Sequence, residues 1–370
     1  MKDNFIADYP AIIKKIQAID PIAYGKSRNY IDGAVTYLSP YISRGVISTT
    51  QVLQIVLKKG YQLKEIESFV KELCWRDYFQ RVAQVKSLDQ ELRQPQADVN
   101  NYFMPLVLSN ATSGIEGIDN AVEELYKTGY MHNHCRMYVA SLVCNIGKSH
   151  WLLPARWMYY NLLDGDWASN ACSWQWVADA NSGKKYYANQ ENINKFTRTN
   201  QQKTFLDLSY EELETAAVPH VLQELIQPVL KTKLPPKTQL VIDNALPSFI
   251  YNYYNLDPQW HEGKLGNRIL ILDPEFFAQY PVSEKCINFA IELSKNIPSI
   301  QIYIGSFTEL FTEYNIQNIY FKEHPFNVGY TGHCDARDWI VPEVSGYFPS
   351  FFSYWKKVEK HLLDKHKFHS

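Results

Sequence analysis

Residues 164–176 read Asp-Gly-Asp-Trp-Ala-Ser-Asn-Ala-Cys-Ser-Trp-Gln-Trp. The segment holds two carboxylates, one amide and three tryptophans. It is too polar for an ordinary core segment and too aromatic for an ordinary loop. Carboxylates followed by indoles suit a site that binds the polar edge of a flat ring and exchanges electrons with it. Function therefore depends on whether the rest of the chain supplies the other parts of such a site.

The bulk composition is that of a globular protein. With 370 residues, 46% hydrophobic and 21% charged, the chain is long enough for two domains with separate cores. The aromatic content of 14% is high, and a heavily aromatic core accounts for most single rings. The net charge of −2 gives no general electrostatic case for nucleic acid. Residues 1–200 carry 22 basic against 19 acidic side chains and 201–370 carry 15 against 20, which weakly favours anion binding by the first part.

The cysteines argue against a metal site. Six are scattered without a C-x-x-C pair, so we expect no local zinc or iron–sulfur cluster and no metal. The sequence shows neither a signal peptide nor an apolar run of transmembrane length. We therefore expect a cytoplasmic protein with reduced thiols and no membrane partner.

The hydrophobic pattern of the sequence changes near residue 230. Before it, helical periodicity dominates, as in segments 63–82, 119–127 and 133–146. After a Lys-Leu-Pro-Pro-Lys linker at 233–237, short apolar runs alternate with helical patterns. The runs are 240–242, 269–272, 300–304 and 319–321, with helices expected at 284–296 and 347–361. We expect a multidomain α and α/β protein: a helical domain at 1–205, a linker at 206–236 and a small α/β domain at 237–370 that ends in a helix.

The segment 36–45, Thr-Tyr-Leu-Ser-Pro-Tyr-Ile-Ser-Arg-Gly, has the chemistry of a phosphate site. Ser39 is a good N-cap and Pro40 suits the first helical position. The hydroxyls of Thr36 and Ser39 and the free amides of the helix start would face an anion. Alone, the same pattern is usually only an ordinary helix cap.

Glu72, Trp75, Arg76 and Phe79 are spaced to lie along one side of a helix. An acid, an indole and a guanidinium side by side suit a pocket that takes a polar ring and a phosphate. The alternative is an Arg–Glu pair beside a core tryptophan.

A second helix is expected to begin after Gly129, in the segment Thr-Gly-Tyr-Met-His-Asn-His-Cys-Arg-Met at 128–137. Asn133, Arg136 and Met137 share one face of it. Further along, Trp151 precedes Trp174 by 23 residues. Two indoles on packed neighbouring elements suit electron hopping, although two core tryptophans are the simpler interpretation.

Together these segments resemble the flavin-binding domain of the photolyase/cryptochrome family over residues 20–180. The resemblance lies in Leu-Ser-Pro at 38–40, Glu-Leu-x-Trp-Arg-Asp at 72–77, Thr-Gly-x-Met-His-Asn-x-x-Arg-Met at 128–137 and Asp-Gly-Asp-x-Ala-x-Asn-x-x-x-Trp-Gln-Trp at 164–176. The four motifs occur in the family's order and with nearly its spacing. The resemblance implies FAD as cofactor and damaged DNA as partner.

The resemblance also implies a role for each cofactor-facing residue. Residues Thr36, Leu38 and Ser39 would hold the pyrophosphate region of FAD, with charge from Arg76. On the flavin ring, Arg136 and Asp164 would form an ion pair, Asp166 would bond the polar edge and Asn170 would sit beside N5. The further cofactor contacts are Phe79 and Asn133. Trp174 would be the nearest electron donor and Trp151 the next.

A second set would line the cavity that receives a flipped pyrimidine dimer. Its implied members are Glu72, Trp75, Asn133, Met137 and Trp176. Trp176 would stack on the lesion and Glu72 would hydrogen-bond to it, so Glu72 counts with Asn170 and the two donor tryptophans among the catalytic candidates. The identities at 133 and 137 favour cyclobutane dimers over (6–4) lesions.

Three departures from the family pattern stand out. The α/β unit follows the flavin domain instead of preceding it, so we expect no antenna pigment. No tryptophan lies between Trp75 and Trp151, where the family keeps the outer member of its electron-transfer triad. Tyr102 is one substitute, and a different relay is the alternative. After Trp176 an arginine near the lesion is lost, and Lys184 and Lys185 are expected to supply phosphate contacts instead.

The resemblance therefore predicts an FAD-dependent, blue-light-driven lyase that repairs cyclobutane pyrimidine dimers by electron transfer from reduced flavin. The alternative is a cryptochrome-like light sensor without repair activity, in which the acidic C-terminal domain binds a protein partner. These two hypotheses differ in DNA affinity and in whether light splits a dimer.

Overall fold

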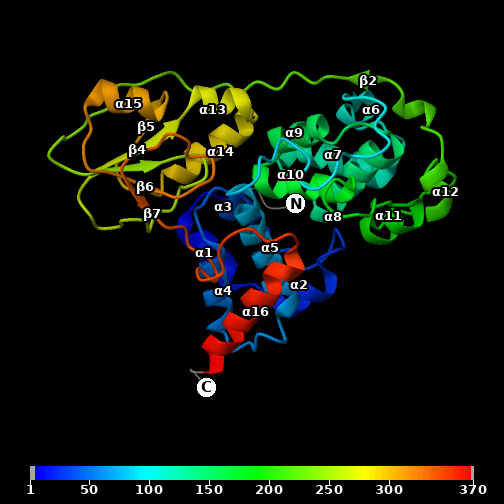
Figure 1. The fold of residues 1–370 in the computed structure, drawn as a ribbon, viewed down its shortest axis with the longest axis horizontal. Coiled ribbons are helices and arrows are strands. Elements are labelled where there is room, and N and C mark those ends of the chain that lie inside the picture. The colour runs from blue at the N-terminus through cyan, green and yellow to red at the C-terminus, as the bar shows by residue number, and fades with distance from the viewer. Residues whose placement is uncertain (1–4, 368–370) are drawn as a thin grey trace. The chain divides into compact units, whose positions relative to one another are not determined.

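The structure is a computed structural model that describes the backbone of residues 5–367 and side chains as far as Asp364. It divides into two compact units. The sheet unit comprises Met1–Ile22, Thr36–Val85 and Lys231–Ser370, and the helical unit comprises Ala23–Val35 and Lys86–Leu230. Figure 1 labels the elements of both.

The helical unit is built from short helices. Its regular elements are α6 (Leu106–Ser109), α7 (Glu116–Thr128), α8 (Asn133–Ser141), the π-helical turn η1 (Leu142–Ile146), α9 (Leu152–Asn161), α10 (Trp167–Val177), α11 (Gln190–Thr197), α12 (Tyr210–Thr215) and the 3₁₀ turn η2 (His220–Leu222). A short antiparallel pair joins β1 (Met104–Pro105) to β2 (Leu225–Ile226). Helix α2 (Pro21–Ser27) spans the boundary between the units.

The segment that connects α7 to α8 depends on one glycine. Gly129 caps α7 with a left-handed backbone, φ 74°, and a Cβ added there would lie 2.6 Å from the side chain of Leu163. Both constraints favour glycine. Gly129 therefore ends α7 next to the segment that carries Asp164.

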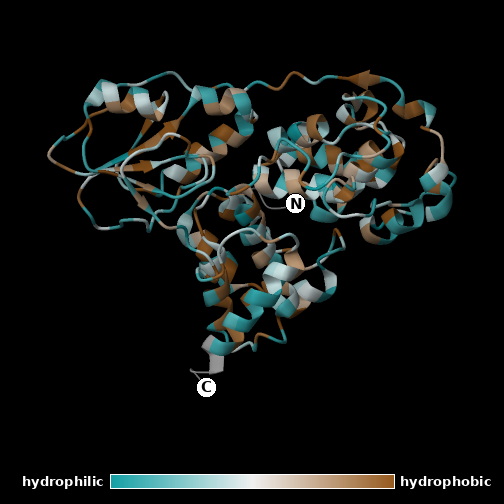
Figure 2. Ribbon diagram, in the orientation of Figure 1, coloured by the Kyte–Doolittle hydropathy of each residue, from teal (hydrophilic) through white to brown (hydrophobic). Residues whose placement is uncertain are grey.

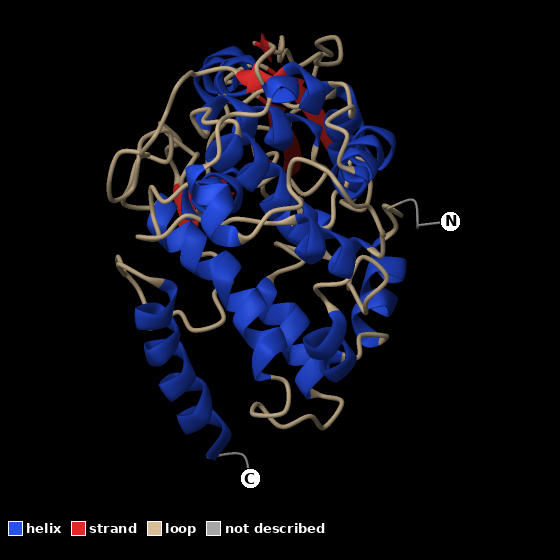
Figure 3. Ribbon diagram, turned by 90° about the vertical axis from the view of Figure 1, so that its right-hand side faces the viewer, coloured by secondary structure: helices blue, strands red, loops and turns tan. Residues whose placement is uncertain are grey.

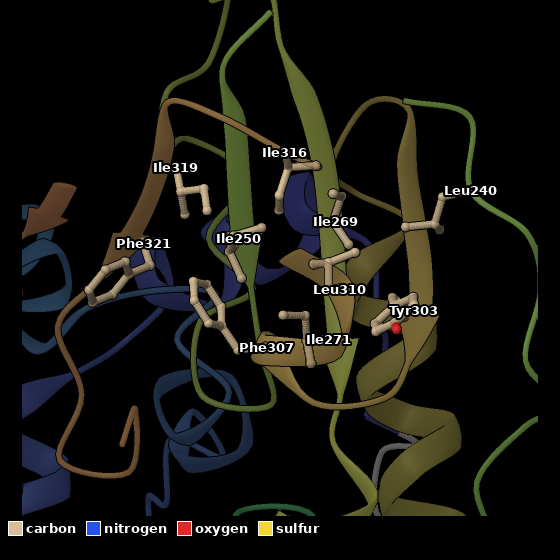
Figure 4. Packing of buried hydrophobic residues seen from close by; sticks show 10 residues of the cluster. All are labelled: Leu240, Ile250, Ile269, Ile271, Tyr303, Phe307, Leu310, Ile316, Ile319 and Phe321. Atoms are coloured by element: carbon tan, nitrogen blue, oxygen red, sulfur yellow. The ribbon is translucent and has the colours of Figure 1, made fainter. Parts of the chain in front are cut away.

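The sheet unit contains a five-stranded parallel sheet of order β5-β4-β3-β6-β7. The strands are β3 (Ser248–Tyr251), β4 (Asn267–Leu272), β5 (Ile300–Ile304), β6 (Ile319–Lys322) and β7 (His333–Asp335). The connecting helices are α13 (Pro274–Gln279), α14 (Glu284–Ser294) and α15 (Phe307–Tyr314). Figure 4 shows strand residues such as Ile250 and Ile269 gathered with Phe307 and Leu310 of α15 in one apolar core. Strands β3 and β4 are buried along their whole length, and Figure 2 colours their apolar residues brown.

Helices from both ends of the chain complete the sheet unit. They are α1 (Tyr9–Gln17), α3 (Ser39–Ser43), α4 (Thr49–Leu57), α5 (Glu67–Ala83) and α16 (Phe351–Lys367). Helix α16, which runs to the end marked C in Figure 3, packs on α5. Phe351, Tyr354, Trp355 and Val358 form its buried face.

The expected combination of helical and α/β structure is confirmed, but several details differ. Residues 240–242 form no strand; Leu240 joins the core, while Val241 exchanges hydrogen bonds with the Gln301 side chain. Strands β3 and β7 were not expected. The compact units also differ from the expected split, since residues 36–85 group with 231–370, and residues 206–230, from the expected linker, join the helical unit. None of the helices within residues 5–367 is long and apolar enough to cross a membrane.

Candidate functional site

The helical unit contains a buried ion pair at the expected position. Arg136 of α8 donates through Nη2 to both carboxylate oxygens of Asp164, at 3.0 and 2.8 Å. Its Nε donates to the carbonyl of Met131 at 2.9 Å. The side chain of Asp164 is only 2% exposed and that of Arg136 is 19% exposed. The pair is therefore a pre-formed, charged element of the site and not a solvated contact.

Asp166 and Asn170 are both held by the start of α10. The Asp166 carboxylate accepts from the amide of Ser169 at 2.8 Å and caps the helix. Asn170 lies one turn later, and its Nδ2 donates to the carbonyl of Ala155 at 2.8 Å. This bond fixes the orientation of the Asn170 amide. The opening segment thus begins as a capped helix with two buried, oriented polar groups.

The two tryptophans at the end of α10 face different surroundings. Trp174 is 2% exposed, whereas Trp176 is 42% exposed and tilted against Tyr186 with ring centroids 5.9 Å apart. A largely exposed indole is unusual, because tryptophan is highly buried on average. Helix α10 therefore presents one indole to the interior and the other to solvent.

Trp151, the expected second electron donor, is fully buried and is the N-cap residue of α9. Helices α9 and α10 pack on each other. In the described residues its ring contacts are with Trp167, at 6.4 Å and 26°, and with His150, at 5.8 Å and 38°. No ring contact with Trp174 is found in that part of the chain. Trp167 is therefore the tryptophan stacked on Trp151.

Among the described residues, two buried polar atoms of α10 have no hydrogen-bond partner, which bears on whether this helix fits FAD. Within residues 5–364, Nε1 of Trp174 and Oγ of Ser169 are buried and have no hydrogen-bond partner. Buried polar groups of this kind are rare unless water or a ligand binds them. A polar molecule that contacts α10 at either position would satisfy an otherwise unpaired atom there, so α10 fits a site for a polar cofactor.

Helix α8 presents Asn133 and Met137 on either side of Arg136 in sequence. Asn133 is exposed and Met137 is half-buried. Their spacing places them on the face that also carries Arg136. They are thus accessible from solvent, as the assignment to a lesion cavity requires.

The expected phosphate-binding residues lie in the sheet unit. Helix α3 has only five residues, and its N-cap is Leu38, whose φ of −89° and ψ of −13° are already helical. Ser39 is therefore the first helical residue and not the N-cap, which corrects the expectation. Thr36 accepts the amide of Leu38 at 3.4 Å, and Arg76 of α5 donates to Ser43 at 2.9 Å. The structure thus joins Arg76 to the helix that carries Ser39.

The side of α5 that carries Glu72 and Trp75 is partly covered. Trp75 stacks on Phe351 of α16 with ring centroids 3.8 Å apart and planes at 11°, and it contacts Phe79 at 5.2 Å. Glu72 is half-buried on the same helix. Phe351 was missed from the sequence, although the aromatic run Tyr347–Trp355 marks the segment. One face of Trp75, an expected lining residue of the lesion cavity, is thus occupied by the protein itself.

The two expected phosphate-contacting lysines differ in the structure. Lys184 is exposed. Lys185 forms an ion pair with Asp98, and its side chain is 14% exposed. The Asp98 pKa is lowered, first by the hydrogen bond from Lys185. Lys184 is therefore the better of the two for a phosphate.

The site residues divide between the units. Those from Thr36 to Phe79 belong to the sheet unit, and those from Asn133 to Lys185 belong to the helical unit. In the part of the chain that the structure describes, no group of three His, Cys, Asp or Glu side chains is arranged to hold a metal ion.

The chain was compared with known proteins. Residues 69–252 match the family model described as the FAD binding domain of DNA photolyase. The match includes the site residues from Glu72 to Lys185 but not Thr36, Leu38 or Ser39.

Curated relatives and solved structures are similar over part of the chain. A deoxyribodipyrimidine photo-lyase of Alkalihalophilus pseudofirmus is 31% identical over 38% of this chain and 30% of the relative. That of Vibrio cholerae is 25% identical over 54% and 45%. A Synechocystis cryptochrome structure has a TM-score of 0.45 at 23% identity, covering 51% of this chain and 43% of that one.

The chain spans less than half the length of these curated relatives. The family match covers the segment that contains Arg136, Asp164 and α10. This segment of the chain, residues 69–252, therefore belongs to the photolyase/cryptochrome family and is an FAD-binding domain.

Proposed function

We propose that the chain is an FAD-dependent, blue-light-driven enzyme that repairs cyclobutane pyrimidine dimers in DNA. The observation that carries the proposal is the division of α10, which bears buried Asn170 and Trp174 near an exposed Trp176. One helix thus offers groups for a buried redox cofactor and an aromatic surface for an external base. The six cysteines, scattered without a C-x-x-C pair, are expected to be reduced thiols, as in the cytoplasm.

The chain's own residues would bind and orient the cofactor. When bound, FAD supplies the light-driven electron transfer, and the protein supplies placement and electrostatics. Arg76 and the hydroxyls of Thr36 and Ser39 would hold the phosphates. The Arg136–Asp164 pair, Asp166 and Asn170 would contact the flavin ring; because they are already hydrogen-bonded, little reorganisation accompanies binding.

The substrate must leave the duplex to reach such a site, and a damaged pair costs less to unstack than an intact one. Stacking on an aromatic side chain contributes about 1–3 kcal/mol per base. Trp176 can offer this stacking surface because it is exposed. Asn133 and Met137 of the helical unit would line the cavity, and Lys184 would contact a backbone phosphate.

Light-dependent splitting of a thymine-dimer oligonucleotide by the reduced holoprotein tests the proposal. Trp176→Ala should weaken binding of the damaged oligonucleotide by roughly the stacking contribution, about 5- to 150-fold. Phe103→Ala removes a similarly exposed ring of the helical unit, 45% against 42% exposed, and should leave binding unchanged. The proposal is wrong if illumination yields no more monomer than a dark control.

The stacking of Phe351 on Trp75 favours a second candidate, a cryptochrome-like light sensor. With that face of Trp75 covered, a lesion cannot stack there in the observed arrangement, and the acidic C-terminal part of the chain would instead bind a protein partner. A sensor should show light-dependent association or protease sensitivity without affinity for damaged DNA. Tight, salt-sensitive binding of damaged DNA would reject this candidate.

A further inference from the structure

Helix α16 (red in Figure 1) has an exposed face that carries one aromatic ring and three lysines. Phe352 is 70% exposed, and Lys356, Lys357 and Lys360 are exposed as well. Because positions 352, 356 and 360 are four residues apart, the ring and two of the lysines form a line about 12 Å long on one side of the helix. We call these four residues the α16 stripe.

The α16 stripe is cationic in a part of the chain that is acidic as a whole. Residues 351–367 hold five lysines against two acidic side chains, whereas residues 201–370 carry 15 basic against 20 acidic side chains. Other lysines of the sheet unit are paired, since Lys237 and Lys322 lie 2.7 and 2.9 Å from carboxylates. No ion pair with a lysine of the α16 stripe is found among residues 5–364. Their charges can therefore serve an anionic partner.

The opposite, apolar face of α16 is already occupied. Phe351 stacks on Trp75 of α5 with ring centroids 3.8 Å apart, and Tyr354 and Val358 are fully buried. A helix that binds a membrane surface or a protein groove does so through its apolar face. The face of α16 that remains for a partner is the α16 stripe, and the packing on α5 holds that face in place.

The chemistry of the α16 stripe indicates the class of partner. Lysines arranged along a helix can neutralise a chain of phosphates, and an exposed aromatic ring can stack on an unpaired base. The ring of Phe352 meets that of Phe351 edge-on, with centroids 5.7 Å apart and planes at 69°. An acidic peptide or a lipid headgroup would use the lysines but would offer no flat ring to Phe352. A single-stranded nucleic acid uses both, because its bases are free to stack.

We propose that the α16 stripe binds single-stranded DNA, with its three lysines on backbone phosphates and Phe352 stacked on a base. The choice of DNA among nucleic acids rests on the proposed function. The α16 stripe belongs to the sheet unit, whereas Trp176 and Lys184 belong to the helical unit. It is therefore a second DNA contact, and it needs neither a lesion nor light.

Salt-dependent binding of a labelled, undamaged oligothymidylate to the holoprotein in the dark tests the lysines. Each phosphate neutralised on a single strand contributes about 0.7 to the slope of log K against log salt. The combined variant Lys356→Gln, Lys357→Gln and Lys360→Gln should therefore lower the magnitude of this slope by about 2. Fluorescence anisotropy over a salt series measures it.

A matched control removes the same charge elsewhere on the sheet unit. Lys14, Lys58 and Lys264 are also exposed and belong to this unit, but none of them lies on α16. The combined variant Lys14→Gln, Lys58→Gln and Lys264→Gln should leave the slope unchanged. Equal slopes in the two combined variants overturn the inference, because the α16 stripe would then contribute no more than other exposed charges.

Phe352→Ala tests the stacking. It should weaken binding of the oligothymidylate by about 5- to 150-fold. Binding of an abasic oligonucleotide of the same length, which has phosphates but no bases, should not change. Phe311→Ala removes another exposed ring of the sheet unit, 45% exposed and on α15, and should affect neither oligonucleotide. Unchanged binding of the oligothymidylate by Phe352→Ala, or an equal loss for both oligonucleotides, overturns the inference.

The inference and the proposed function can fail separately. Dimer splitting in the light, together with an unchanged slope in the α16 variant, would reject the inference and leave the repair hypothesis intact. A lowered slope without dimer splitting would support the inference and reject repair. If the unaltered protein does not bind the oligothymidylate at all, the inference alone is wrong.

Discussion

The Arg136–Asp164 pair shows how burial determines the contribution of a single ion pair to the free energy of unfolding. Removing Arg136 leaves the 2% exposed carboxylate of Asp164 without its cation. Loss of one partner of a buried pair costs about 3–5 kcal/mol. We therefore expect Arg136→Met to lower the free energy of unfolding by about that amount and to reduce the FAD retained on purification. Urea denaturation and flavin absorbance measure the two effects.

A matched control separates burial from charge. Arg198→Met removes a cation from the Arg198–Asp32 pair of the helical unit, whose side chains are 55% and 60% exposed. Exposed pairs contribute about 0–1 kcal/mol, so this change should be nearly silent. Equal losses of unfolding free energy in the two variants would show that the buried pair contributes no more to stability than the exposed pair.

Asp77 makes the stability of the protein depend on pH. Its carboxylate accepts from Thr49 at 2.8 Å and from the amide of Ile340 at 2.9 Å. Burial nevertheless raises its pKa from 3.8 to about 6, against the lowering effect of these bonds and of Arg337 and Arg81. The folded protein therefore holds a proton that the unfolded chain has already lost between pH 4 and 6.

The stability contributed by Asp77 is thus complete below pH 4 and is lost as the pH rises to about 6. A shift of this size corresponds to about 3 kcal/mol. Asp77→Asn keeps an acceptor for Ile340 but does not titrate. The difference in unfolding free energy between the unaltered protein and Asp77→Asn should therefore change by about 2 kcal/mol between pH 4 and 6, with the rest of the effect outside this range. A difference that stays constant over this range would show that Asp77 does not titrate there.

At the scale of elements, α16 is held on α5 by its buried aromatic face. Phe351 is 3% exposed and stacks on Trp75, while Tyr78 donates to the carbonyl of Phe348 at 3.3 Å. Truncation of a buried phenylalanine costs about 3–5 kcal/mol. Phe351→Ala should lower the unfolding free energy by about that amount, as measured in urea. Its neighbour Phe352 is 70% exposed, and Phe352→Ala should change stability by less than about 0.5 kcal/mol.

The elements also show where sequence patterns suffice. Helices α5, α7, α8 and α14 follow apolar periodicity, and the strands β4, β5 and β6 are short apolar runs. Strand β3 contains Phe249, Ile250 and Tyr251, which favour strands, but the aromatic residues Tyr253 and Tyr254 follow closely, so its end is not marked by a distinct β pattern. The 240–242 run has such a pattern but contacts β5 through the Gln301 side chain instead of joining the sheet.

The candidate site was likewise predictable from the sequence only in part. Four motifs identified the Arg136–Asp164 pair and the roles expected along α10 before any contact was known. The stacking of Phe351 on Trp75 and of Trp167 on Trp151 depends on which helices pack together, and no local pattern encodes it. Contacts between residues far apart in sequence are therefore where the structure adds most to the site.

At the scale of the whole molecule, the salt dependence of DNA binding distinguishes the repair hypothesis from the sensor hypothesis. With a net charge of −2, DNA binding must depend on a few local cations. Each neutralised phosphate changes the slope of log K against log salt by about 0.9. Lys184→Gln should therefore reduce the magnitude of this slope for a dimer-containing duplex by about 1.

Lys195→Gln is the matched control for this measurement. Lys195 is also exposed and belongs to the same unit, but it lies on α11 and outside the proposed DNA-facing residues. Fluorescence anisotropy over a salt series measures both slopes. A slope lowered only by Lys184→Gln places a phosphate at Lys184 and supports repair, because a sensor has no need to neutralise DNA. Equal slopes in both variants would mean that Lys184 contacts no phosphate, and an affinity independent of salt would favour the sensor.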